Sequence, residues 1–324
     1  AQSCSIPLNA FDDSGGMKTM SEDNEAVDTS CCAYCGIAEI DDIKLMDCDD
    51  CDLVKYCSDA CQKNHKPEHD DACKKRAAEL RDELLFKQPE SSHLGDCPIC
   101  MLPLPLDERC GIRFCCSKFI CEGCNHQHFI REMEARNRLP KCPFCREPTP
   151  TGDVNGGLTK QIMKRAKADD PEAMCQMGGD SEEGKDYIGA FEWYTKAAEL
   201  GHAEAHSRLA FMYHEGLGVE RDSGKFIHHL EEAAIGGHPS ARHDLGRNEY
   251  TKGNMERAAK HWIIAANQGH DTSLERLMKM FKLERLEGGR RSVSEEDLAD
   301  ALRGHQSAVV ATKSPQREAA AAFF

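Results

Sequence analysis

The spacing of apolar residues divides the chain near residue 150. After that point, apolar side chains recur three and four positions apart in "YIGAFEWYTKAA", "SGKFIHHLEEAA" and "MERAAKHWIIAA". This is the period of an amphipathic helix, and a Gly follows each stretch, as is typical of a helix end. Before that point, Leu80, Leu84 and Leu85 predict a short helix that ends before Pro89.

The helical half of the chain repeats itself. "AAELGHAEA" (197–205), "AAIGGHPSA" (233–241) and "AANQGHDTS" (265–273) align, and "AKADDPEA" (166–173) is a fainter earlier copy. A two-helix unit of about 35 residues cannot bury its apolar face alone, so the units are expected to stack into a solenoid. His202, His238 and His270 occupy one equivalent position after a helix-ending Gly, so we assign them structural roles rather than metal binding. Cys175 is interpreted as a small buried residue.

The middle copy, "AHSRLAFMYHEGLGVERDSGKFIHHLEEAAIGGHPSA", resembles the Sel-like repeat (SLR), a relative of the tetratricopeptide repeat, including its YxxGxGVxxD turn. The resemblance covers about residues 166–285, and the third copy has a shortened turn. Because such repeats are protein-binding scaffolds, the resemblance implies that the solenoid recruits protein partners. The segment from Ser292 has a serine N-cap and a helical stripe, which predict a capping helix.

Nineteen cysteines change the interpretation of the first half. CxxC pairs in an intracellular chain indicate zinc bound by thiolates. From Cys32, the spacing C-x2-C-x12-C-x2-C-x5-C-x3-C-x7-H-x3-C supplies eight ligands for two tetrahedral, structural sites. The stretch "YCSDACQKNHKPEHDDAC" resembles the MYND zinc finger. Its interleaved ligand order implies one ion on Cys32, Cys35, Cys57 and Cys61, and a second on Cys48, Cys51, His69 and Cys73.

One residue of this finger departs from the family pattern. Lys66 stands three residues before His69, where MYND fingers usually carry Trp. The family commonly binds short proline-rich peptides, and Tyr56 is the aromatic residue that remains. Peptide binding by this finger is therefore left open.

The second cysteine cluster contains three CxxC pairs, so two tetrahedral ions need two more ligands from Cys110, Cys115, Cys116, His126 and His128. Lys118 is excluded because a protonated amine has no lone pair. The stretches "CPICMLPLPLD", "CCSKFICEGC" and "CPFCREP" resemble an all-cysteine RING finger, in which Cys116 is the fourth ligand. The third ligand position of such a RING corresponds to Phe114, which cannot bind zinc. We therefore assign Cys115 as the third ligand, with Cys110 as the alternative. Cross-bracing then implies one ion on Cys97, Cys100, Cys121 and Cys124, and a fourth ion on Cys115, Cys116, Cys142 and Cys145.

The RING resemblance implies an activity without a covalent nucleophile. Such fingers hold a ubiquitin-charged conjugating enzyme so that a substrate lysine attacks the thioester. The implied contact residues are Ile99, Pro143 and Arg146, the last at the position that bridges ubiquitin and the enzyme. The predicted function is a RING-type ubiquitin ligase whose solenoid and MYND finger recruit protein substrates. The alternative is a non-catalytic adaptor, and a lysine methyltransferase is disfavoured because no SET-type motif flanks the finger.

Charge and hydropathy narrow the expected partners. The net charge is −15, and residues 1–75 carry 17 acidic and 7 basic residues, which argues against binding a phosphate backbone. The sequence contains neither an apolar run of about 18 residues nor a secretory leader, so we expect no membrane contact and a cytoplasmic location, with the nucleus also compatible.

The expected fold is multidomain, with two small zinc-stapled α+β modules followed by an all-α helical-repeat solenoid. The predicted parts are a disordered acidic tail (1–30), a MYND-type finger (31–75), a helical linker (76–96), a RING-type finger (97–150), Sel-like repeats (160–290) and a capping helix with a tail (291–324).

Overall fold

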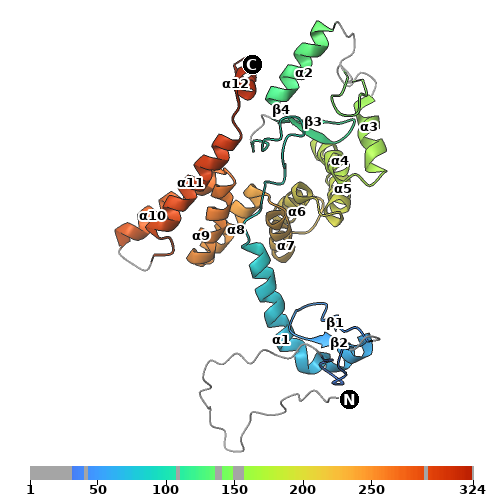
Figure 1. Ribbon diagram of the computed structural model, residues 1–324, viewed down its shortest axis with the longest axis vertical. Coiled ribbons are helices and arrows are strands. Elements are labelled where there is room, and N and C mark those ends of the chain that lie inside the picture. The colour runs from blue at the N-terminus through green and yellow to red at the C-terminus, as the bar shows by residue number, and fades with distance from the viewer. Residues whose placement is uncertain are drawn as a thin grey trace, which may run out of the picture. The chain divides into compact units, whose positions relative to one another are not determined.

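The computed structural model describes residues 31–39, 43–106, 110–135, 141–148, 157–287 and 291–322. The predicted tail at 1–30 lies outside these residues. The described residues form two compact units, one up to Leu85 and one from Phe86 onward. Figure 1 shows the elements of each unit.

The first unit is a small module built around cysteine. Strand β1 (Met46–Asp47) pairs antiparallel with β2 (Lys55–Tyr56), and helix α1 (Asp59–Leu85) follows. The helix expected around Leu80 to Leu85 is the C-terminal end of α1. The core consists of the buried side chains Cys32, Cys48, Cys51, Tyr56 and Cys73. With so few apolar side chains, this module needs metal ligation or another staple to fold.

The second unit begins with residues 86–96, which contain no helix or strand, and continues as a second small module. Strand β3 (Cys110–Arg113) pairs antiparallel with β4 (Lys118–Cys121), and helix α2 (Glu122–Glu134) follows directly. This module packs on the helices that follow, because Phe114 contacts their buried cluster and Arg165 Nε lies 3.0 Å from Ser117 Oγ.

The remaining helices form the predicted solenoid. Helix α3 (Gly157–Ala166) precedes three antiparallel pairs: α4 (Pro171–Glu183) with α5 (Tyr187–Glu199), α6 (Ala203–Glu215) with α7 (Ser223–Ile235), and α8 (Pro239–Thr251) with α9 (Met255–Asn267). Helices α10 (Asp271–Glu287) and α11 (Glu295–Ala311) both pack on α9, and α12 (Pro315–Ala321) packs on α2 (Figure 1). The predicted capping helix is α11, whose N-cap is Ser294 in a capping box.

The glycines of the repeat turn have separate structural reasons. Gly216 ends α6 at φ 76°, a left-handed conformation that favours Gly. Gly218 is also left-handed, and a Cβ there would lie 2.5 Å from the carbonyl oxygen of Tyr187 in the preceding repeat. The turn motif therefore fixes both the helix end and the contact between repeats.

The three recurrent histidines join neighbouring repeats. His202 and His238 are the N-caps of α6 and α8, where each Nδ1 accepts a hydrogen bond from a backbone N–H. Because Nδ1 accepts, Nε2 carries the proton and points to the preceding repeat. The Nε2 contacts are His202 with Glu172 (3.0 Å), His238 with Glu204 (2.8 Å) and His270 with Ser240 (3.5 Å). The geometry supports the structural role expected for them.

None of the helices that the structure describes combines the length and the apolar character needed to cross a membrane.

Candidate metal centres

One group of three possible ligands, His93, Glu204 and His238, lies in the described residues, but four other groups hold four ligand atoms each, and within each group the atoms lie within 4.8 Å of one another. Their members are Cys32, Cys35, Cys57 and Cys61; Cys48, Cys51, His69 and Cys73; Cys97, Cys100, Cys121 and Cys124; and Cys115, Cys116, Cys142 and Cys145. These are the sixteen residues selected from the sequence, in the same four sets.

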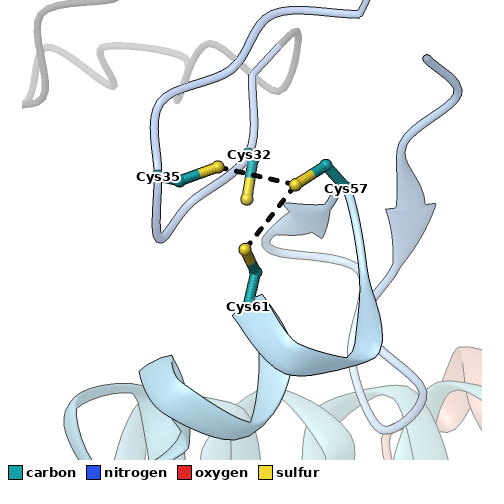
Figure 2. A group of neighbouring side chains, drawn as sticks. All are labelled: Cys32, Cys35, Cys57 and Cys61. Carbon is teal, nitrogen blue, oxygen red and sulfur yellow. Dashed lines mark hydrogen bonds between the residues drawn. The ribbon is translucent and has the colours of Figure 1, made fainter.

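The first group joins a chain turn to the start of α1. Figure 2 shows the thiols of Cys35, Cys57 and Cys61 pointing toward one another, with Cys32 between them. The sulfur atoms lie 3.5 Å apart for Cys35 and Cys57, and 3.6 Å apart for Cys57 and Cys61. Four thiolates around zinc at about 2.3 Å have sulfur–sulfur distances of about 3.8 Å, so the spacing fits a tetrahedral zinc ion.

The second group uses one face of α1. His69 and Cys73 are four residues apart on this helix, which places both side chains on the same face. His69 Nε2 lies 3.2 Å from Cys51 Sγ, and Cys48 Sγ lies 3.7 Å from Cys73 Sγ. The imidazole therefore offers Nε2 to the ion, and the donor set of three thiolates and one imidazole suits zinc.

The other two groups interleave along residues 97–145. The sulfur–sulfur distances are 3.8 Å for Cys100 and Cys121, 3.7 Å for Cys116 and Cys142, and 3.3 Å for Cys115 and Cys145. Cys110 lies outside both groups, with its Sγ 3.9 Å from the carbonyl oxygen of Pro105. Lys118 Nζ lies 5.4 Å from the centre of the Phe144 ring. The structure therefore brings Cys115, rather than Cys110, to the fourth group.

Three of the CxxC turns share one backbone geometry. In each, the N–H of the residue after the second cysteine donates to the carbonyl of the first cysteine, as in Gly36 to Cys32 (2.9 Å), Met101 to Cys97 (2.8 Å) and Arg146 to Cys142 (3.1 Å). That last residue is left-handed in all three turns, with φ of 71°, 56° and 65°. This conformation costs little for Gly but about 1–2 kcal/mol for Met and Arg.

Backbone N–H groups favour the thiolate at the first cysteine of these turns. Burial raises the pKa of Cys32, but hydrogen bonds from the backbones of Cys35, Cys57 and Tyr34 outweigh it and lower the pKa to about 6. The pKa of Cys97 and that of Cys142 are brought to about 7 by the same balance. Burial and neighbouring thiols raise the pKa of Cys116 to about 11. Several thiolates this close together repel one another. A divalent cation bound between them offsets that repulsion, which again fits zinc.

The predicted partner-contact residues lie beside the metal groups. Ile99 is 46% exposed, Arg146 is exposed, and Pro143 is half-buried. Tyr56, the aromatic expected to remain on the MYND surface, is 1% exposed, and its hydroxyl lies 3.0 Å from His65 Nδ1. Tyr56 therefore belongs to the core of the finger and offers no platform for a peptide.

One residue at the third group was not identified from the sequence. Arg317, from the C-terminal helix α12, lies against Cys100. A serine followed by proline at 314–315 marks the start of this helix, but no local pattern connects it to cysteines more than 190 positions earlier.

Family models match two parts of the chain. The model described as "MYND finger" matches residues 32–73. The model described as "Sel1 repeat" matches residues 171–202, 203–238 and 239–270, each containing one of the helix pairs.

Two curated fungal proteins share short stretches with this chain. "Chitin synthase regulator SKT5" of Saccharomyces cerevisiae is 44% identical over 57 residues, which are 18% of this chain and 8% of that protein. "Chitin synthase regulatory factor 4" of Schizosaccharomyces pombe is 34% identical over 86 residues, which are 26% of this chain and 14% of that protein. The matches therefore span only a small share of the length of either relative.

Two solved structures are also similar to this chain. One is c5321, an SLR-fold protective antigen of uropathogenic Escherichia coli, at 25% identity and a TM-score of 0.38 over 47% of this chain and 33% of that chain. The other is a Sel1 repeat protein of Oxalobacter formigenes, at 27% identity and a TM-score of 0.39 over 48% of this chain and 64% of that chain.

The two family matches and the helix pairs agree on the organisation of the chain. The MYND finger implies zinc binding, and the combination of modules indicates an adaptor for protein interactions. This chain contains a MYND finger followed, further along, by three consecutive Sel1 repeats.

Proposed function

We propose that this chain is a zinc-stapled adaptor that holds one set of protein partners with its MYND finger and another with its Sel1 repeats. The observation that carries the proposal is that each of the four groups supplies four protein ligand atoms. A zinc ion with four protein ligands has no open position for water or substrate, so it stabilises a shape instead of catalysing a reaction.

We assign partner docking on the repeats to the exposed face of α6 and α8 that carries Phe211 and Tyr250. Phe211 on α6 and Tyr250 on α8 are 47% and 38% exposed. Counted from the start of their repeats, they lie three positions apart, which places them on the same face of equivalent helices. Large exposed aromatic side chains are frequent among the residues that dominate the energy of protein interfaces.

The relatives suggest what one partner does. Both are named as regulators of chitin synthase, which is an enzyme. We therefore include in the proposal that at least one partner is an enzyme whose activity changes when the adaptor binds.

Quantitative affinity capture with the full-length chain tests the adaptor proposal. The double substitution Phe211→Ala/Tyr250→Ala is expected to weaken one set of partners at least tenfold, and Cys57→Ser in the finger is expected to weaken a different set. Ile188→Ala, at an exposed apolar residue of α5, is the matched control and should retain both sets. If the finger and repeat variants lose the same partners, or lose none, the division of labour is wrong.

A RING-type ubiquitin ligase is the second candidate. The interleaved groups of residues 97–145 enclose the β3–β4 hairpin and α2, and Ile99 and Arg146 are exposed on the first and last CxxC turns. An Arg fixed by a metal-bound turn and free at its side chain can donate to ubiquitin and to the conjugating enzyme together. The backbone of Arg146 is left-handed, at φ 65°.

Single-turnover discharge of ubiquitin from a charged conjugating enzyme onto free lysine separates the two candidates. A ligase accelerates discharge, Arg146→Ala slows it without weakening enzyme binding, and Ile99→Ala weakens that binding. Lys141→Ala, at the exposed cation before Cys142, is the control for charge. The adaptor alone gives no acceleration with any conjugating enzyme in a broad panel.

A further inference from the structure

The C-terminal helix α12 returns to the module of residues 97–148. It lies beside α2 in Figure 1. The approach is close at Gly123, where a Cβ would lie 2.8 Å from the backbone nitrogen of Arg317. Ser314 caps the helix through its Oγ, which accepts from the Arg317 N–H at 3.3 Å.

Arg317 connects this helix to the third metal group. Its Nη1 donates to the carbonyl oxygens of Pro103 and Thr312, both at 2.7 Å. Its Nη2 lies 3.4 Å from Cys100 Sγ and 3.2 Å from the carbonyl oxygen of Leu102. The positive charge of the guanidinium also favours the thiolate form of Cys121. Arg317 as a whole is only 9% exposed.

The charge of this group explains why a buried cation is stable there. Four thiolates around one zinc ion carry a net charge of −2, and burying that charge is costly without a counter-charge. A guanidinium is always protonated and donates several hydrogen bonds in a fixed plane, so it can reach thiolates and carbonyls together. The carbonyls of residues 102, 103 and 312 hold the side chain in place, while Cys100 and Cys121 receive its charge.

We propose that Arg317 is an outer-shell positioning residue of the group Cys97, Cys100, Cys121 and Cys124, and that zinc affinity and docking of α12 stabilise each other through it. Outer-shell partners typically change metal affinity by 10- to 100-fold. By linkage, the factor by which docking of α12 raises zinc affinity equals the factor by which zinc favours docking. Helix α12, through Arg317, is therefore docked on the module of residues 97–148 when this group holds its ion, and we call this contact the latch.

Pulsed alkylation of the full-length, zinc-loaded chain during a chelator challenge tests the latch. Mass spectrometry reports the labelling rate of each cysteine, so every group is followed separately. Arg317→Met keeps the length of the side chain but removes its charge, and it should speed labelling of Cys97, Cys100, Cys121 and Cys124 by roughly 10- to 100-fold. Arg317→Lys retains the charge without the planar fork and should restore part of the protection.

The group Cys115, Cys116, Cys142 and Cys145 is the internal reference, because it belongs to the same module and Arg317 touches none of its members in the contacts described above. Arg303→Met, at an exposed arginine of α11, is the matched control and should change neither group. Ser314→Ala weakens the cap of α12 but leaves the guanidinium, so it should speed labelling of the third group only modestly.

Three outcomes would overturn the proposal. The first is equal labelling rates in the wild type and Arg317→Met. The second is equal acceleration of both groups, which would mean that the substitution destabilises the whole module. The third is labelling in the wild type that does not depend on zinc at all. Hydrogen exchange of residues 315–321 gives the reciprocal readout, which should rise in Arg317→Met while zinc is still bound.

Discussion

At the scale of single residues, the metal turns tolerate a backbone conformation that their side chains disfavour. Gly36 closes its turn at φ 71°, whereas Met101 and Arg146 adopt the same left-handed conformation with a Cβ. The sequence spacing could identify the turns, because CxxC is a local signal. It could not identify the strain, because that depends on the hydrogen bonds which close each turn.

Replacing Met101 by Gly should stabilise the second module. Met101 is 70% exposed, so its side chain loses little packing, while Gly relieves the left-handed strain. We expect the free energy of unfolding to rise by about 0.5–1 kcal/mol, and Gly36→Ala to lower it by a similar amount. Denaturant titration of the zinc-loaded chain measures both. A destabilised Met101→Gly variant would mean that the Met side chain makes a contact worth more than the strain.

A partly buried histidine of the 86–96 segment should make the docking of this segment sensitive to acid. The ring of His93 stacks on that of His238 with 4.2 Å between ring centres, and the backbone N–H of His93 donates to the carbonyl of Gly237 at 3.0 Å. Burial first, and then His238, lower the pKa of His93 to about 4, against the opposite effect of Glu204. The unfolded chain therefore binds more protons below pH 6.5, and stability falls as the pH falls from 6.5 toward 4.

His93→Phe keeps the stacked ring but removes this titration. The wild type should lose up to about 3 kcal/mol relative to the variant between pH 6.5 and pH 4. Denaturant unfolding at a series of pH values measures the free energy of unfolding of both proteins. Subtracting one profile from the other cancels the contribution of the other histidines. Parallel pH profiles for the two proteins would show that His93 already titrates normally in the folded chain.

At the scale of elements, the first and third repeats each pack a glycine of their first helix against an aromatic ring of their second helix. A Cβ at Gly178 or at Gly246 would lie 2.5 Å from the ring of Tyr194 or of Trp262. In the middle repeat, Ala210 stands at the glycine position and Leu230 at the aromatic position. The residue with a Cβ is therefore paired with a smaller side chain. The periodicity alone predicted the helix pairs, but it could not predict this matching, because the two positions meet only after the helices pack.

Gly246→Ala should therefore destabilise the solenoid, although Ala usually stabilises a helix by about 1 kcal/mol. The extra methyl overlaps the indole of Trp262, and overpacking costs typically 1–3 kcal/mol. Adding Trp262→Leu, which imitates the middle repeat, should recover part of the loss caused by Gly246→Ala. A double-mutant cycle by thermal unfolding measures this coupling, and strictly additive effects would contradict the overlap.

At the scale of the whole molecule, the metal ligands could be predicted from the sequence, whereas the packing of one module on another could not. The spacing of cysteine and histidine residues supplied the candidate ligands, because zinc ligands come in short local pairs. The resemblance to MYND and RING fingers implied their division into the four sets that the structure brings together. The attachment of the second module to the solenoid was not predicted. It depends on Phe114, on the Ser117–Arg165 contact, which spans 48 positions, and on the contact of Arg317 with Cys100, which spans 217.

The adaptor account depends on four saturated metal groups in one chain. Native mass spectrometry of the zinc-replete, full-length protein tests this most directly, because it counts the ions bound to each folded molecule. We expect four zinc ions, two held by residues 32–73 and two by residues 97–145. A count of two or fewer would contradict it, because at least one of the two modules would then lack the metal that shapes it.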